Sequence, residues 1–525
     1  MPRGYLCILL HAHLPFVRHP EFEDSLEERW LFEALTETYL PLLRMLEERA
    51  DRGRTGRITI SLSPTLLAMF EDPLLRRRYA WHVGRLLELA EREVARTAQD
   101  PRFHPVALHY RDRFRATLAQ FDERYRRDVT SAFRAVSDAG QASLITCGAT
   151  HGFLPLMSLG APSWRAQIGT AARAFERAIG RPPEGMWLPE CGYTPGVEEV
   201  LREFGIRWFA VDTHGILDAC PRPLPGTYAP FRTAAGVTAL GRDADSSRQV
   251  WSATEGYPGD AFYREYYRDQ GFDLPLDEVR SYLPSGGTRT HLGLKYYRIT
   301  DRRGTHREPY EPERARARTR EHAAHFVRER SAQVRAASER IGQPALLLAP
   351  YDAELMGHWW YEGPEWLGHV LDECEGDPDL EAADPTRAIA SIPRPCEGRL
   401  HPSSWGEGGH ASVWLDPSND WIYRHLNHAA ERMQALAGTE RRDPLERRAL
   451  AQAGRELLLA QASDWAFIMR TGTLVPYAVR RTELHLARFA RLADGLMKGA
   501  VDPIELAEWE ELAPIFPGID PGLFA

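Results

Sequence analysis

Short apolar runs that each end in a polar residue recur along the first two-thirds of this 525-residue chain. The runs contain β-branched or aromatic side chains and are typical of buried strands. They cover residues 5–10, 58–62, 143–147, 185–189, 207–211, 249–252 and 345–350. Amphipathic stretches typical of helices separate most of them, namely residues 31–50, 163–179, 197–204 and 313–341.

This alternation predicts a fold of the α/β class. Strands that alternate with helices form a parallel sheet with right-handed crossovers. About seven such units suggest a closed or nearly closed (β/α) barrel. In a barrel of this kind, the residues at the C-terminal ends of the strands carry the chemistry, and the polar residues that end the apolar runs occupy that position.

Three parts of the chain depart from a simple barrel. Residues 72–139 are rich in Arg and Glu, and they predict a helical insertion after the second strand. Residues 219–304 are rich in Pro, Gly, Tyr and Arg, and they predict an irregular excursion over the barrel mouth. Strand signals stop near residue 396. We therefore expect a catalytic barrel over residues 1–395 and a helical domain over 396–525, with long helices at 420–438, 444–462 and 475–498.

Charge and cysteine usage exclude several classes of protein. The net charge of −9 provides no basic field for nucleic acid or for an anionic membrane. The apolar run 5–10 is too short for a signal peptide or a membrane span. Six scattered cysteines without a CxxC pair indicate reduced thiols. These features predict a cytoplasmic protein that binds neither nucleic acid nor membrane.

Two carboxylates are the first candidates for chemistry. Glu190 and Asp352 each follow an apolar run, so each is expected to project into the barrel mouth. Two carboxylates there can divide the work of cleaving a glycosidic bond, one as nucleophile and the other as general acid and base. Either residue could instead cap a helix or form a structural ion pair.

Histidines form the second group of candidates. His11 and His13 share one face of a strand because their spacing is two residues. With His151, Asp212 and His214 they could form a zinc site. They could equally donate hydrogen bonds to sugar hydroxyls, or each could be a buried structural histidine.

Aromatic residues form the third group. The chain has 14 Trp and 19 Tyr, and several stand beside Gly, Glu or His. Aromatic faces beside polar groups suit a flat, hydroxyl-rich ligand such as a sugar. The candidates are His358, Trp359, Trp360, Trp405, Trp414, Trp251 and Tyr257. Asp464, next to Trp465 on an expected C-terminal helix, either reaches back to the barrel or pairs with an arginine.

Motifs of other enzyme classes are missing from the sequence. It contains no GxxxxGK[ST], no GxGxxG behind a strand, no GxSxG and no HExxH. Phosphate-loop, Rossmann, serine-hydrolase and zincin chemistries therefore have no support.

Five segments together resemble the five sequence regions of glycoside hydrolase family 57. They are residues 11–15 (HAHLP), 148–152 (GATHG), 187–190 (WLPE), 349–355 (APYDAEL) and 462–465 (ASDW). Residues 358–363 (HWWYEG) and 404–406 (SWG) further resemble the 1,4-α-glucan branching enzymes and their amylase-like relatives.

The resemblance implies an incomplete (β/α)7 barrel with an α-helical C-terminal domain. It also implies a retaining mechanism without a metal or other cofactor, acting on α-1,4-glucans such as glycogen, amylose or maltooligosaccharides. In such a mechanism Glu190 is the nucleophile and Asp352 the general acid and base. The implied branching activity transfers the cleaved chain to form α-1,6 branches, in a monomer or small homo-oligomer. Residues expected to line the subsites are His11, His13, His151, Asp212, Trp251, Tyr257, His358, Trp359, Trp360, Trp405, Trp414, Asp464 and Trp465.

One departure from the branching pattern favours hydrolysis. Branching members of the family carry a longer mobile loop after the strand that ends here at Asp212, with a tyrosine that helps to exclude water. Residues 214–228 of this chain are short and have no matching tyrosine. The glycosyl-enzyme partitions between water and a sugar hydroxyl according to how well water is excluded. An α-amylase-type hydrolase or a 4-α-glucanotransferase is therefore the close alternative.

Two more distant alternatives belong to other functional classes. One is a zinc-dependent deacetylase or amidohydrolase that uses His11, His13, His151 and Asp212. The other is a glucan-binding module without catalytic activity.

Overall fold

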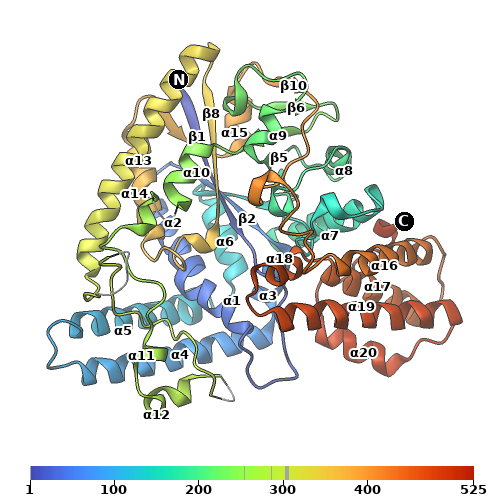
Figure 1. Ribbon diagram of the computed structural model, residues 1–525, viewed down its shortest axis with the longest axis horizontal. Coiled ribbons are helices and arrows are strands. Elements are labelled where there is room, and N and C mark those ends of the chain that lie inside the picture. The colour runs from blue at the N-terminus through green and yellow to red at the C-terminus, as the bar shows by residue number, and fades with distance from the viewer. Residues whose placement is uncertain (1, 253–254, 285–286, 302–306) are drawn as a thin grey trace.

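Seven parallel strands form the centre of the molecule (Figure 1). The computed structural model describes residues 2–252, 255–284, 287–301 and 307–525. Along the barrel the order is β7-β5-β4-β3-β2-β1-β8, and each neighbouring pair is parallel. The strands are β1 (Gly4–Ala12), β2 (Ile58–Leu62), β3 (Ala142–Thr146), β4 (Gly185–Met186), β5 (Trp208–Val211), β7 (Thr238–Gly241) and β8 (Ala345–Asp352).

The barrel is almost closed between β7 and β8. The short strand β6 (Phe231–Thr233) pairs antiparallel with the first residues of β7, and β10 (Cys396–Gly398) pairs with β6. Because β6 pairs with the start of β7, the chain contacts β8 only after the end of β7. There Arg242 forms an isolated parallel bridge with Leu348. The expected incomplete (β/α)7 barrel is thereby confirmed. Outside the ring, β9 (Leu380–Ala382) pairs with the start of β1.

One expected strand is wrong. Residues 249–252 lie at the end of helix α10 (Ala244–Trp251). The barrel strand that this run was expected to form is instead β7, which lies within the segment expected to be irregular. The cause is a helix cap, because the Asp243 carboxylate accepts a hydrogen bond from the Ser246 N–H at 2.8 Å. The cap starts a helix whose Val250 side chain is buried.

Helices surround the barrel (Figure 1). Those that follow or precede the strands are α1 (Glu28–Ala34), α2 (Leu40–Asp51), α3 (Pro64–Glu71), α7 (Ala161–Ile179), α8 (Val197–Glu203), α9 (Thr213–Leu217), α13 (Pro312–Ile341), α14 (Gly363–Gly376) and α15 (Pro385–Ser391). Between β2 and β3 stand α4 (Pro73–Arg96), α5 (His104–Ala119) and α6 (Val129–Asp138). The excursion holds α11 (Gln270–Asp273) and α12 (Leu276–Val279).

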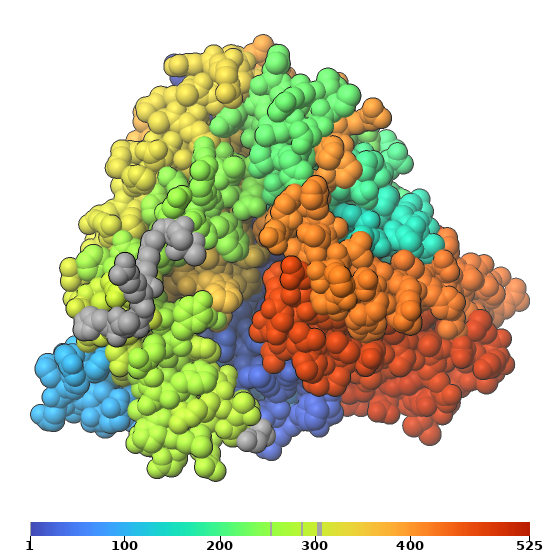
Figure 2. Space-filling model, in the orientation of Figure 1, coloured from blue at the N-terminus to red at the C-terminus, as the bar shows by residue number. Residues whose placement is uncertain are grey.

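The C-terminal part of the chain is helical. Its elements are α16 (Trp421–Ala437), α17 (Pro444–Ala460), α18 (Ser463–Thr471), α19 (Val475–Lys498) and α20 (Pro503–Leu512). They pack together at one side of the barrel, and Figure 2 shows a hollow between these red and orange segments and the green excursion. Among the described residues, no helix is long and apolar enough to cross a membrane.

The barrel interior is a small apolar core of its own. It consists of alternate residues from the strands, among them Tyr5, Cys7, Leu9, Ile145, Leu346 and Leu348. Residues of the segment containing α15, such as Ala388 and Ile392, belong to the same cluster. Because the side chains alternate, the next inward positions at the C-terminal ends of β1 and β8 are His11 and Asp352.

We predict that Asp243 stabilises the closure of the barrel. Its carboxylate caps α10 and accepts a hydrogen bond from Gln333 at 2.7 Å, and its N–H donates to Leu348 of β8 at 2.8 Å. Asp243→Ala should cost about 2 kcal/mol, because the cap is lost and the partly buried Gln333 amide keeps only its longer hydrogen bond to the Tyr228 hydroxyl. The measurement is the midpoint of thermal unfolding.

The matched control for this prediction is Asp443→Ala, which removes the exposed N-cap of α17. It should lower the midpoint less than Asp243→Ala does. Equal midpoints for the two variants would show that the position at the β7–β8 junction adds nothing beyond an ordinary cap.

Candidate active site

His11 and Asp352 lie side by side at the C-terminal ends of β1 and β8. The parallel register pairs His11 with Asp352 on one side and with Ser61 of β2 on the other. His11 is buried, and the Asp352 side chain is only partly accessible. The alternation of the two strands thus brings a carboxyl group and an imidazole to the top of the barrel interior.

Glu190 follows β4 in a turn of unusual geometry. Its φ of 61° lies in the left-handed region, which a glutamate rarely adopts. The Trp405 backbone N–H donates to the Glu190 carbonyl oxygen at 3.0 Å and holds this turn. Strained backbone of this kind often occurs at functional sites, where it aims a side chain.

Two donors fix the Glu190 carboxylate. The indole Nε1–H of Trp405 donates to Oε2 at 2.8 Å, and the Ser463 hydroxyl donates to Oε1 at 2.9 Å. Both donors lie far along the chain, in the segment before the C-terminal helices and at the start of α18. Ser463 was not among the predicted residues, although it stands within the motif at 462–465.

The two carboxyl groups differ in their affinity for a proton. Burial raises the pKa of Glu190 to about 6, while the hydrogen bonds from Trp405 and Ser463 act against this rise. Burial raises the pKa of Asp352 well above its ordinary value, and the negative charges of Glu354 and Glu190 raise it further. At neutral pH, Glu190 is therefore mainly ionised, whereas burial and the neighbouring negative charges favour the protonated form of Asp352.

A directed chain of hydrogen bonds ends on Glu190. Burial holds the pKa values of His11 and His151 well below their ordinary range, so both rings are neutral. Because Ser463 donates to Glu190, Nδ1–H of His151 donates to the serine oxygen at 2.8 Å. Nε2 of His151 then accepts from Nε2–H of His11 at 2.9 Å. The chain assigns one tautomer to each ring.

His13 and Asp464 join the barrel to α18. Nε2 of His13 lies 3.1 Å from an Asp464 carboxylate oxygen, and the ring stacks on His151 with centroids 3.9 Å apart. Burial lowers the pKa of His13, but the charge and hydrogen bond of Asp464 outweigh it and raise the pKa overall. Of the two alternatives for Asp464, the structure thus shows the contact with the barrel.

The structure does not assemble the predicted zinc set. Asp212 accepts a hydrogen bond from Arg242 at 3.2 Å and lies 3.3 Å from Nδ1 of His214. Across the described ranges, the groups with metal-ligand spacing combine the histidines with Cys147 or with Asp464, and none contains Asp212. The zinc hypothesis is therefore wrong about Asp212.

Three of the predicted aromatic residues lie near the site or on the surface. The Trp405 ring contacts Trp187 edge-on at 4.8 Å and has Trp251 at 6.5 Å. Trp359 is 53% exposed and stacks on Tyr266 at 4.5 Å. Tyr266 was not predicted, because it stands in the excursion without a recognisable motif. These rings have faces that a sugar can contact.

Four other aromatic residues that were predicted to line subsites are buried in the structure. Trp360, Trp414 and Trp465 are each 1% exposed and form part of the core, so they have no free face for a ligand. Motif position alone could not reveal this, because Trp359 and Trp360 are neighbours with opposite exposure. Tyr257 packs against α13 and hydrogen-bonds His325 at 2.8 Å.

His358 is held between two partners. Its Nδ1 lies 2.7 Å from Glu37, and its Nε2 lies 3.1 Å from the Tyr266 hydroxyl. Through its contact with the Tyr266 hydroxyl, His358 helps to fix the ring on which Trp359 stacks.

A nearly closed parallel barrel with two partly buried carboxyl groups at the C-terminal ends of its strands is the arrangement of a glycoside hydrolase. The chain belongs to glycosyl hydrolase family 57, whose model matches residues 7–341. A second model, described as 1,4-alpha-glucan branching enzyme, C-terminal, matches residues 425–524.

The proteins similar to this chain include some named branching enzymes and one named alpha-amylase. The chain is 33% identical to the 1,4-alpha-glucan branching enzyme TK1436 of Thermococcus kodakarensis, over 97% of this chain and 77% of the relative. The structure of the alpha-amylase AmyC from Thermotoga maritima matches with a TM-score of 0.94 and 40% identity, covering 100% of this chain and 99% of that one. A GH57-type branching enzyme from Pyrococcus horikoshii matches with a TM-score of 0.88 and 31% identity, covering 99% and 97%.

We predict that Trp405→Phe moves the acid limb of the pH profile. The change keeps an aromatic ring but removes the N–H that favours the ionised form of Glu190, so the pKa of Glu190 rises above about 6. With Glu190 in its predicted role as the ionised nucleophile, kcat/KM should begin to fall at a pH about one unit higher than in the wild type. The measurement is the pH dependence of kcat/KM with amylose as the substrate, from about pH 4 to about pH 9, which covers the acid and the alkaline limb of the profile.

Trp251→Phe is the control for this profile. Its ring lies beside Trp405, and the substitution should leave the acid limb in place even if KM changes. An acid limb of Trp405→Phe that coincides with the wild type would refute the role of the indole donor.

Proposed function

We propose that this protein is a retaining enzyme that cleaves α-1,4 bonds of a glucan and forms α-1,6 branches. The observation that carries the proposal is the carboxyl pair, in which two donors hold Glu190 and burial with nearby negative charge favours the protonated form of Asp352. A retaining glycosidase needs this division between nucleophile and acid. The similarity to proteins named branching enzymes, over almost the whole chain, supports the same assignment.

In the first step, Glu190 attacks the anomeric carbon of the glucose at the cleavage point. Asp352 gives its proton to the departing glycosidic oxygen, so the leaving chain has a new 4-hydroxyl group. A glycosyl ester now joins the donor chain to Glu190, and Asp352 is ionised. The raised pKa of Asp352 suits it to this donation near neutral pH.

In the second step, the roles of the carboxyl groups reverse. Asp352 removes the proton from a 6-hydroxyl group of an acceptor glucan, and the oxygen attacks the anomeric carbon. The ester bond breaks and Glu190 leaves as a carboxylate. The donors Ser463 and Trp405 stabilise that carboxylate. Two inversions give net retention.

Glucose units of the chain stack on the exposed rings. Two pairs of rings offer aromatic faces to the glucan, namely Trp359 with Tyr266 and Trp251 with Trp405. His13 and Asp464 are placed to hydrogen-bond sugar hydroxyls. In this arrangement, the helical region assigned to residues 396–525 completes the site of the barrel region assigned to 1–395.

Hydrolysis is the second candidate activity. It is favoured by the 40% identity to a protein named alpha-amylase and by the short segment after Asp212. Both activities share the glycosyl ester on Glu190 and differ in whether water or a 6-hydroxyl group attacks it. We also propose a cytoplasmic location, which agrees with six unclustered cysteines.

Product analysis on amylose tests the proposal. After incubation, one sample is treated with a debranching enzyme for chain-length analysis, and a second is assayed for reducing ends. We expect new debranchable chains with few new reducing ends. Glu190→Gln should lower the rate by about a thousandfold or more, because the amide cannot form the ester, while amylose binding persists.

Controls separate the alternatives. Glu203→Gln, an exposed change on α8, should match the wild type, and excess chelator should leave the activity intact. Reducing ends without new branches would establish hydrolysis instead of branching. Loss of activity in chelator that zinc restores would establish metal chemistry, and full activity of Glu190→Gln would remove the proposed nucleophile.

A further inference from the structure

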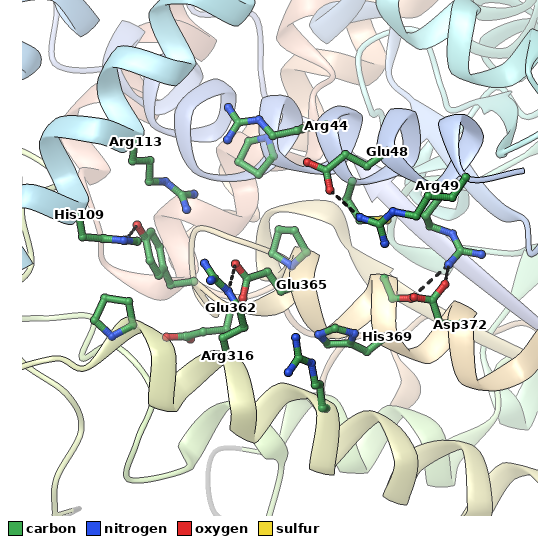
Figure 3. A pocket seen from close by; sticks show the side chains of 18 of the residues that line it. Arg44, Glu48, Arg49, His109, Arg113, Arg316, Glu362, Glu365, His369 and Asp372 are labelled. Atoms are coloured by element: carbon green, nitrogen blue, oxygen red, sulfur yellow. Dashed lines mark hydrogen bonds and ion pairs between the residues drawn. The ribbon is translucent and has the colours of Figure 1, made fainter. Parts of the chain in front are cut away.

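A second pocket lies outside the barrel, between α2, α5, α13 and α14 (Figure 3). Its volume is about 450 Å³, which suits a small molecule. Six arginines and four carboxylic side chains line it, together with two histidines. None of the residues around Glu190 belongs to this lining. The pocket has no role in the proposed mechanism.

The arginines at the two ends of the pocket differ in their partners. At one end, Arg49 is paired with Asp372 and Glu375, and Arg52 is paired with Glu48. At the α5 end, Arg44 donates to the neutral amide oxygen of Gln120 at 2.7 Å. Within the described residues, neither Arg44 nor Arg113 forms an ion pair.

Arg113 has unused hydrogen-bonding capacity. Its guanidinium lies 4.1 Å from the centre of the Tyr361 ring, and its Nη2 is buried without a hydrogen-bond partner among the described residues. A buried guanidinium nitrogen with no acceptor is costly. An anion bound to this guanidinium would supply the negative charge that no described carboxylate provides to Arg113 through an ion pair.

The arginines at this end of the pocket lower the pKa values of neighbouring groups. Burial lowers the pKa of His109 to about 3, and Arg113, Arg316 and Arg264 lower it further. Burial also lowers the pKa of Arg44, with Arg113 as the next cause. His109 is therefore neutral and hydrogen-bonded to the Tyr361 hydroxyl at 2.8 Å, so it adds no positive charge at this end of the pocket.

A buried carboxyl group also belongs to the lining of the pocket. Glu362 is 3% exposed, and its Oε1 accepts hydrogen bonds from the Tyr310 hydroxyl and the Arg264 N–H. Its Oε2 is buried without a partner among the described residues. Burial raises the pKa of Glu362 to about 7, so this oxygen can accept a hydrogen bond or donate one.

We propose that this pocket binds a sugar monophosphate, with the phosphate between Arg113 and Arg44 and a sugar hydroxyl group on Glu362. A guanidinium fork suits a phosphate because it donates two parallel hydrogen bonds. The carboxyl oxygen would distinguish a sugar ester from inorganic phosphate. The pocket is thus a ligand site separate from the glucan site.

Calorimetric titration of the full-length protein tests the proposal, with glucose 6-phosphate, inorganic phosphate and glucose as separate probes. We expect saturable binding of glucose 6-phosphate, about tenfold or more weaker binding of inorganic phosphate, and no measurable binding of glucose at the same concentration. Absence of saturable binding of glucose 6-phosphate, or equal binding of glucose, would overturn the proposal.

Variants place the ligand in this pocket. Arg113→Lys keeps the charge but removes the fork, and Arg44→Gln removes the second cation. Each should weaken glucose 6-phosphate binding by about tenfold. Arg52→Gln is the matched control at the paired end of the pocket and should change the affinity less than about twofold.

Thermal unfolding without ligand checks that each variant is folded. If Arg113→Lys does not fold, Arg44→Gln and Glu362→Gln decide the result. Glu362→Gln should weaken the ester while leaving inorganic phosphate unchanged. Wild-type affinity in Arg44→Gln, or losses equal to those of Arg52→Gln, would contradict the assigned site.

Discussion

The carboxylate of Glu190 depends on donors that come from distant parts of the chain. The barrel supplies Glu190 from a turn with positive φ after β4, but Trp405 and Ser463 supply the hydrogen bonds that orient it. Ser463 is itself fixed by His151, which is bonded to His11 of β1. Barrel and C-terminal helices therefore complete one site between them, and a displacement of α18 would change the proton affinity of Glu190 as well as its position.

The sequence predicted the parts of the fold that follow from burial. Buried strands have continuous apolar runs, and the polar residues that end these runs, His11 and Asp352 among them, were expected at the barrel mouth. The error at residues 249–252 arose because a capping residue, Asp243, starts a helix where the composition resembles a strand. The short strand β7 was hidden in a segment rich in turn-forming residues.

The candidate site was predicted less completely. Glu190, Asp352 and the histidines stand next to strand ends, where position and residue type agree. Trp360, Trp414 and Trp465 were assigned to substrate because of their motifs, yet they are buried. Exposure depends on long-range packing and cannot be predicted from neighbours in the chain. Ser463 and Tyr266 act through contacts across the fold, and no local pattern marks such contacts.

A small difference in activation free energy decides whether the glycosyl ester is consumed by branching or by hydrolysis. Both pass through the same ester, and a tenfold change in partition corresponds to about 1.4 kcal/mol. Small changes in water access near the site can therefore separate relatives that share a fold and a carboxyl pair. This agrees with the high similarity of the chain both to proteins named branching enzymes and to one named alpha-amylase.

The most direct measurement is the trapping of the glycosyl ester. Asp352→Asn is incubated with α-maltosyl fluoride, whose fluoride leaves without an acid, and the protein is then analysed by peptide mass spectrometry. Because the variant lacks the base for the second step, we expect one maltosyl unit to accumulate on the peptide that contains Glu190. An adduct on another residue, or turnover of the fluoride without any adduct and with inverted stereochemistry, would contradict the account.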